Sequence, residues 1–334
     1  MSSEKLNEQV AGLLGGEAFT LEPIPGGANN RVYKVKAKEK NFLLKVYFQH
    51  PADTRDRLGA EYSFVSFAWG AGIRSIPAPV AADRKNNLAL YEFIDGKKPA
   101  VSDVTEKAVA QALNLFIDIN RYKAEPAAAA LPLASEARFS IAGHLECIDS
   151  RVKNLSRLKP ESGPDEAAKK FVERELLPAW AAVKTKAAGQ AGKLKLPLEA
   201  EIDRRLSPSD FGFHNALVTP DGAVKFIDFE YAGWDDPAKM VCDFFCQQAV
   251  PVDFKYLDKF AGGVAATLSD PALNRKKIEL LLPVYEIKWC CILLNEFLPA
   301  GRERRRYAMD YENYEGSKQA QLDKTRDLLE RIKL

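Results

Sequence analysis

The stretch Leu206–Asp243, LSPSDFGFHNALVTPDGAVKFIDFEYAGWDDPAKMVCD, has a strand–turn–strand pattern with Asp210 before it, Asp228 at its end and Asn215 between them. Asp210 precedes a short apolar run, and the turn signal Asp221-Gly222 leads into a second apolar run that ends before Asp228. Because a hairpin brings its two ends together, the side chains of Asp210, Asn215 and Asp228 are predicted to converge.

Three oxygen-bearing side chains at the base of a hairpin suit a hard cation such as Mg²⁺. Phosphoryl transfer needs metal to neutralise phosphate charge and a carboxylate to orient the attacking hydroxyl. Asn215 and Asp228 are therefore the candidate metal ligands, and Asp210 is the candidate catalytic residue. Asp and Asn also favour turns because they bond to the local backbone, so this stretch alone leaves a structural interpretation open.

The pattern D-x-x-x-x-N followed by IDFE resembles the aminoglycoside phosphotransferase and choline kinase family, relatives of protein kinases that phosphorylate small molecules. Phe226–Trp234, FIDFEYAGW, is especially similar to the choline and ethanolamine kinase branch. The family has His two residues before the catalytic Asp, whereas this sequence has Pro208. That departure bears on the rigidity of the catalytic loop and on the rate.

The resemblance implies an α+β, two-lobed protein-kinase-like fold. Residues 1–96 are expected to form an N-terminal lobe with an antiparallel sheet, which binds the nucleotide and ends in a hinge. Residues 97–334 are expected to form a mainly helical lobe that carries the catalytic and substrate-binding groups. Strand-like segments dominate the first part of the chain and helical patterns the rest, which independently favours two regions of different class.

The composition is that of an ordinary soluble globular protein. The 334 residues are 46% hydrophobic and 28% charged, and 48 basic against 46 acidic residues give a net charge of +2, so charge provides no argument for nucleic acid or membrane partners. No signal-peptide pattern opens the sequence, and the apolar stretch Ile278–Leu298 is interrupted by charges. Five cysteines without a C-x-x-C pair agree with a reducing compartment, and we expect a cytoplasmic protein.

The turn cluster Pro25–Asn30, PGGANN, lies between two strand-like segments. Backbone amides of Gly26 and Gly27 can curl around phosphate oxygens, although an ordinary hairpin turn would need the same residues. In the family, the similar segment covers the nucleotide phosphates. Gly26, Gly27 and Asn30 are therefore candidate nucleotide-binding residues.

Lys45 stands in the middle of the apolar strand Asn41–Tyr47. Burying a lysine is costly unless its ammonium group meets an anion, and the available anions are nucleotide phosphates and Glu61 of the following predicted helix. A lysine that extends its charge to solvent is the alternative. The order of strand lysine and helix glutamate resembles the pair that positions ATP in kinases.

Leu88–Phe93 is a predicted strand, and the segment through Gly96 leaves the predicted sheet at the place where the resemblance puts the hinge. In the family, the main chain of the hinge binds adenine, so Glu92, Phe93 and Ile94 are main-chain candidates. The resemblance also implies that Asp243 supports the catalytic loop.

The part of the chain after Asp243 is expected to contribute most to the choice of acceptor. An aromatic and acidic pocket for a cationic amine could be formed by Tyr285, Trp289 and Glu296 of one predicted helix together with Glu230, Tyr231 and Trp234, with core packing as the alternative. Glu230 could reach a second metal instead of the substrate. The run RERRR at Arg302–Arg306 could bind a phosphate or an acidic sugar, or be a solvated helix face.

Together these observations predict a magnesium-dependent transferase that moves the γ-phosphate of ATP to a hydroxyl of a small molecule, such as an amino alcohol, a sugar or an aminoglycoside. A non-catalytic nucleotide-binding module is the alternative. A protein kinase is a weaker one, because H-R-D, D-F-G and A-P-E are all missing. The sequence leaves open the acceptor, the pathway and the oligomeric state.

Overall fold

The computed structural model describes residues 3–25, 30–38, 40–49, 55–196, 198, 203–299 and 314–332. The chain divides into two compact units: Met1–Ser135 with Pro208–Gly233, and Glu136–Ser207 with Trp234–Leu334. The first contains a five-stranded antiparallel sheet and the second is mainly helical. The predicted α+β class is thereby confirmed, whereas a domain boundary after residue 96 stays a prediction.

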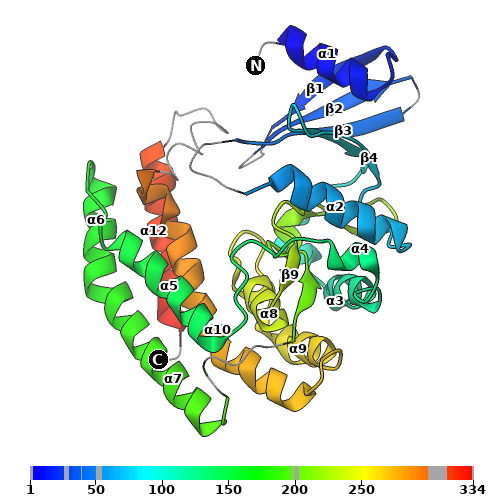
Figure 1. Ribbon diagram of the computed structural model, residues 1–334. Coiled ribbons are helices and arrows are strands. Elements are labelled where there is room, and N and C mark those ends of the chain that lie inside the picture. Colours follow the sequence, from blue (N-terminus) through cyan, green and yellow to red (C-terminus); the bar gives the residue numbers. More distant parts are fainter. Residues whose placement is uncertain are drawn as a thin grey trace. The chain divides into compact units, whose positions relative to one another are not determined.

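The sheet of the first unit has the strand order β1-β2-β3-β5-β4, and each neighbouring pair is antiparallel (Figure 1). The sheet contains five strands, one of which corresponds to the apolar strand predicted over Asn41–Tyr47. They are β1 (Phe19–Ile24), β2 (Arg31–Ala37), β3 (Lys40–Val46), β4 (Pro79–Asp83) and β5 (Leu88–Glu92).

The alternation of side chains along β3 gives its two faces different environments. Leu44 packs in an apolar core that includes Leu6 and Val10 of helix α1 (Ser3–Leu13). Lys45, the next residue, lies on the opposite face and is nevertheless 6% exposed. The strand therefore buries a charge on the face away from α1.

Helix α2 (Arg57–Gly70) begins at a side-chain cap, because Asp56 accepts a hydrogen bond from the Gly59 amide at 2.7 Å. Its buried positions include Arg57 and Glu61, which are four residues apart and so share one helix face. This helix brings two buried charged side chains to the same side.

The predicted catalytic hairpin is present in the first unit. Strands β7 (Ala216–Val218) and β8 (Val224–Phe226) pair antiparallel, and the short helix η3 (Phe213–Asn215) precedes them. The Ile227 amide donates to the carbonyl of Asn215 at 2.9 Å. This bond holds the residue before Asp228 against the end of η3.

The first unit also contains helices η1 (Val101–Asp103), α3 (Glu106–Arg121) and α4 (Pro126–Ala129). The last of these lies in a stretch rich in alanine. Pro126 suits the first turn of a helix, and Ala128 is fully buried.

The second unit is built on α8 (Pro237–Cys246), whose residues are all buried and which packs against α10 (Pro271–Leu293). Cys242 and Cys246 are both buried in this core. The other elements are α5 (Ile141–Leu155), α6 (Gly163–Phe171), η2 (Val172–Leu176), α7 (Leu177–Lys193), β6 (Arg205–Ser207), β9 (Gly233–Asp235), η4 (Phe254–Tyr256), α9 (Leu257–Ala265), η5 (Leu294–Phe297) and α12 (Tyr314–Arg331).

Over the described ranges of the chain, no helix combines the length and apolar character needed to cross a membrane.

Gly233→Ala should destabilise the folded protein by about 2–4 kcal/mol. Gly233 has a φ of +158°, and an added Cβ would lie 2.7 Å from the amide nitrogen of Ala134 and closer still to the carbonyl oxygen of Pro132. Neither backbone atom can rotate away. Gly12→Ala is the matched control, because no atom lies within 4 Å of its added Cβ and a helical Gly→Ala change stabilises by about 0.5–1 kcal/mol. Urea unfolding of both variants measures the difference, and equal stability would contradict the packing described here.

Candidate active site

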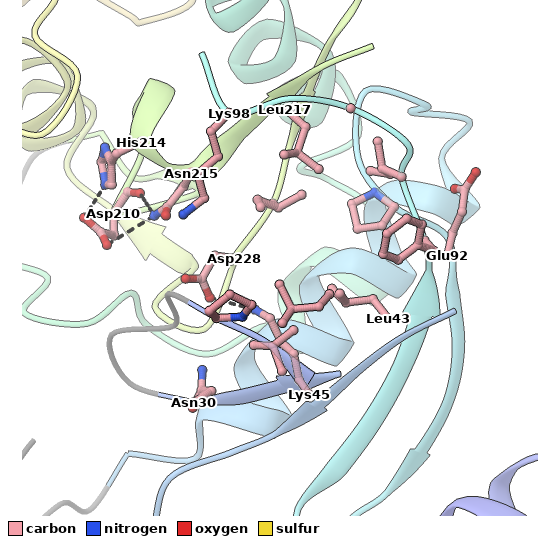
Figure 2. A pocket seen from close by; sticks show the side chains of 18 residues that line it. Asn30, Leu43, Lys45, Glu92, Lys98, Asp210, His214, Asn215, Leu217 and Asp228 are labelled. Atoms are coloured by element: carbon pink, nitrogen blue, oxygen red, sulfur yellow. Dashed lines mark hydrogen bonds and ion pairs between the residues drawn. The ribbon is translucent and has the colours of Figure 1, made fainter. Parts of the chain in front are cut away.

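A cavity of about 500 Å³ lies in the first unit (Figure 2), within the usual range for small-molecule sites. Strands β1 to β3, the segment after β5 and both ends of the β7–β8 hairpin contribute to its lining. The lining residues are Ile24, Pro25, Asn30, Val32, Leu43, Lys45, Pro77, Glu92, Phe93, Ile94, Gly96, Lys98, Asp210, His214, Asn215, Leu217, Ile227 and Asp228.

Lys45 joins two carboxylates from distant parts of the sequence. Its Nζ lies 2.8 and 2.9 Å from the two oxygens of Glu61 and 2.7 Å from Oδ1 of Asp228. The structure thus brings together the expected strand lysine and helix glutamate and adds the candidate metal ligand to the pair. Their roles in nucleotide binding stay predictions.

The charges of this group change the ionisation of its members. Burial alone would lower the pKa of Lys45, but Asp228 and Glu61 more than offset it and the pKa is raised. Burial raises the pKa of Glu61, with Lys45 opposing that rise. Lys45 therefore stays charged, and it favours the anionic form of Glu61 against the effect of burial.

Two tyrosines support Glu61. The Tyr47 hydroxyl donates to Oε2 of Glu61 at 2.8 Å and lies 2.8 Å from the Tyr91 hydroxyl. Burial raises the pKa of both phenols well above the usual range, so both remain neutral hydrogen-bond donors. Sequence reasoning missed them, although Tyr47 follows Lys45 by two residues in a strand and so faces the same way.

Asp210 is held by its own loop. The side-chain amide of Asn215 donates to the backbone carbonyl of Asp210 at 2.9 Å and to its Oδ2 at 3.2 Å, and His214 Nε2 lies 3.2 Å from Oδ1. Figure 2 shows these side chains together at one end of the cavity. The position of His214, four residues after Asp210, carried no signal for this contact with the candidate catalytic carboxylate.

Two residues of this loop region have left-handed backbone conformations. Ser209 has a φ of 62° and Asp228 a φ of 69°. Non-glycine residues rarely adopt such values, and they cluster at functional sites, where surrounding contacts maintain them. At Asp228 the ion pair with Lys45 supplies such a contact.

The residues present fit a magnesium ion that is shared with phosphate. The Asn215 amide nitrogen is used by Asp210, which leaves its carbonyl oxygen for a cation, and Asp228 keeps its second oxygen beside the one bound to Lys45. No group of three or more His, Cys, Asp or Glu suited to a metal occurs in the described part of the chain. Phosphate oxygens and water would therefore complete the octahedron.

The candidate nucleotide residues fall in two places. Glu92, Phe93 and Ile94 line the cavity, but the amide of Glu92 already donates to the carbonyl of Ala78 at 2.8 Å. Gly26 and Gly27 lie outside the described residues, as does the Arg302–Arg306 run. Asn30, at the end of the glycine turn, is described and lines the cavity. Lys98 also lines the cavity, and sequence reasoning missed it because nothing distinguishes it from the other lysine and proline residues of its segment.

In the first unit, the candidate acceptor residues Glu230 and Tyr231 have protein partners. Arg57 Nη1 donates to Oε1 of Glu230 at 2.6 Å and to the Tyr231 hydroxyl at 2.8 Å. The guanidinium groups of Arg55 and Arg57 each lie 5.2 Å from the Tyr231 ring centroid. Cationic side chains thus already lie near the ring that was expected to receive an amine.

The remaining candidates belong to the second unit. Trp289 Nε1 donates to Oδ1 of Asp243 at 2.9 Å, and Lys288 Nζ lies 2.9 Å from Oδ2 of the same carboxylate. Burial alone would raise the pKa of Asp243, but the positive charges of Lys288 and Lys239 hold that pKa below its usual value. The expected support of the catalytic loop by Asp243 stays a prediction, as does the acceptor role of Trp234 and Trp289.

A Lys–Glu–Asp ion network beside a loop with Asp and Asn, on an α+β scaffold with an antiparallel sheet, defines a protein of the kinase-like class. Residues 20–273 match the model of the phosphotransferase enzyme family (APH), so the chain belongs to that family. Comparison with curated protein sequences gave no match.

Solved structures of the same fold include choline kinases and aminoglycoside phosphotransferases. A choline/ethanolamine kinase family protein from Mesorhizobium loti has a TM-score of 0.61 at 16% identity, covering 99% of this chain and 95% of that chain. Choline kinase LicA from Streptococcus pneumoniae has 0.60 at 14%, covering 98% of each chain. Spectinomycin phosphotransferase APH(9)-Ia, in complex with ADP and spectinomycin, has 0.59 at 16%, covering 94% of this chain and 98% of that chain. Family membership and these neighbours support a small-molecule phosphotransferase.

Proposed function

We propose that this protein transfers the γ-phosphate of ATP to a hydroxyl group of a small molecule. The observation that carries the proposal is the convergence of Lys45, Asp228, Asn215 and Asp210 on one cavity. Phosphoryl transfer depends on positioning and charge neutralisation, and these four side chains supply a cation, two metal ligands and a carboxylate.

Each residue has a distinct task in this proposal. Lys45, held by Glu61, binds phosphate oxygens, and Asp210 orients the acceptor hydroxyl and takes its proton. Because a carboxylate is a weak base, orientation of the hydroxyl is the larger part of that task. Asn215 and Asp228 would hold Mg²⁺, which neutralises phosphate charge when bound.

The adenine and phosphate ends of the nucleotide have separate candidate binding groups. Because the Glu92 amide is engaged, the main chain of Phe93 and Ile94 is left to offer the N–H group for adenine. We assign the phosphates to the turn with Gly26 and Gly27. The similar structures are a choline/ethanolamine kinase family protein, a choline kinase and a spectinomycin phosphotransferase, and on that basis an amino alcohol, a sugar or an aminoglycoside is the proposed acceptor class.

The test is phosphorus NMR of Mg·ATP with pooled amino alcohols, sugars and aminoglycosides. A new phosphomonoester signal that requires both protein and pool supports transfer, and dividing the pool identifies the acceptor. Pro208, which replaces the family's histidine, favours a nucleotide-binding module as the second candidate. That candidate predicts calorimetric binding of Mg·ATP without product from any pool.

Asn215→Ala should raise the Mg²⁺ concentration needed for half-maximal ATP binding by about tenfold or more, because one of two protein ligands is lost. Asn114→Ala, at an exposed position of α3, is the matched control and should have no effect. Calorimetric titration of ATP at several Mg²⁺ concentrations gives the result. An unchanged Mg²⁺ dependence would remove Asn215 from the metal site.

A further inference from the structure

Glu230 lies at the meeting point of three segments of the first unit. Its side chain is 1% exposed, and its two oxygens have different partners. Oε1 accepts from Arg57 at the start of α2 at 2.6 Å, and Oε2 accepts from the Asn30 amide at 2.6 Å. The carboxylate is therefore bound on both sides by protein groups.

The orientation of Asn30 is determined by a second bond. Its Oδ1 accepts from the Phe48 amide at 3.1 Å, so its Nδ2 must point to Glu230. Asn30 is the residue immediately before β2, and it lines the cavity. Glu230 thus holds the start of β2 beside the cavity.

Helix α2 contacts the segment that contains Glu230 at a second point. Glu61, one helical turn after Arg57, accepts from the Phe229 amide at 3.1 Å while binding Lys45. Arg57 and Glu61 therefore contact consecutive residues of the 229–230 segment. This segment directly follows Asp228, the candidate metal ligand.

We propose that Glu230 is a positioning residue, which ties Asn30 and helix α2 to the segment that carries Asp228, and that it does not bind the acceptor. The inference rests on the proposed function, because it gives Asn30 and Asp228 their nucleotide roles. Removing the Glu230 contacts would leave both free to move relative to Lys45. Affinity for Mg·ATP, and not for the acceptor, should then fall.

The Asn30–Glu230 pair can be exchanged without changing the charge of the group. Glu230→Gln alone leaves one acceptor oxygen for two donors, Asn30 and Arg57, and turns its own NH2 group toward one of them. Asn30→Asp alone places two carboxylates opposite each other. In the double variant, the glutamine at position 230 can donate to the new carboxylate at position 30 and accept from Arg57. That carboxylate can still accept from the Phe48 amide. The double variant should therefore restore every donor–acceptor pair.

Calorimetry of Mg·ATP with these variants tests the proposal. Each single variant should weaken binding by about tenfold, and the double variant should recover most of that loss, because groups in direct contact couple strongly. Glu22→Gln, at an exposed surface pair with Lys36, is the matched control and should bind like wild type. Asn30→Ala introduces no charge and should also weaken binding, which keeps the test valid if a single variant fails to fold.

The outcomes separate this inference from the proposed function. If wild type does not bind Mg·ATP, the proposed function fails, while the Tm values of wild type, the two single variants and the double variant still test the Asn30–Glu230 coupling. If wild type binds and Glu230→Gln binds equally well, the positioning role is overturned. A raised acceptor KM at unchanged Mg·ATP affinity would instead assign Glu230 to the acceptor.

Discussion

Asp210→Asn should slow phosphoryl transfer by about 10²–10⁴-fold while leaving the affinity for Mg·ATP nearly unchanged. Asparagine keeps the size of the side chain but cannot accept the proton of the acceptor hydroxyl. The amide group also disturbs the local bonds, because the side chain now accepts from His214 and Asn215 through one oxygen instead of two. Single-turnover transfer and calorimetric binding of Mg·ATP measure the two quantities separately.

Asp118→Asn is the matched control for this experiment. Asp118 lies on α3 in a surface pair with Arg121, with 41% of its side chain exposed, so its substitution should change neither quantity. Equal losses of transfer and of Mg·ATP binding in Asp210→Asn would contradict the role assigned to Asp210. Transfer at the wild-type rate would do so more directly.

Lys45→Met should abolish measurable Mg·ATP binding and destabilise the fold by about 3–5 kcal/mol. Lys45 is the cation bound to Glu61 and Asp228, and the Glu61 side chain is 3% exposed. Removing the cation leaves a buried carboxylate without its charge partner. Urea unfolding gives the loss of stability, and calorimetry gives the loss of binding.

The destabilisation by Lys45→Met should depend on pH. Burial raises the pKa of Glu61 in the folded state and Lys45 opposes this, so the variant raises it further. A carboxyl whose folded pKa exceeds its unfolded value destabilises the fold at high pH, and the penalty is relieved as pH falls through the folded pKa. The stability deficit should be smaller at about pH 5.5 than at about pH 8.

Two further variants control this result. Lys45→Arg keeps the charge and should recover more stability than nucleotide binding, since a planar guanidinium does not reproduce the position of the ammonium group. Lys36→Met removes a lysine from a surface pair with Glu22 and should cost less than about 1 kcal/mol. A deficit that does not change with pH would mean that Glu61 does not depend on Lys45 for its charge.

The sequence by itself determined the features that depend on near neighbours. Alternating apolar residues and turn chemistry predicted the strands of the first unit and the β7–β8 hairpin, because strand periodicity and turn conformation are local properties. The hairpin in turn predicted that Asp210, Asn215 and Asp228 would lie together. Lys45 was identified because a charge within an apolar strand needs a partner.

The tertiary structure alone decided which distant groups became those partners. Lys45 meets Asp228 across 183 positions, and Asn30 meets Glu230 across 200. Composition and spacing suggested an acceptor pocket for Glu230, but strand register and the docking of α2 surround it with Asn30 and Arg57. Side-chain pairs so far apart in sequence are set by packing, for which local patterns carry no signal.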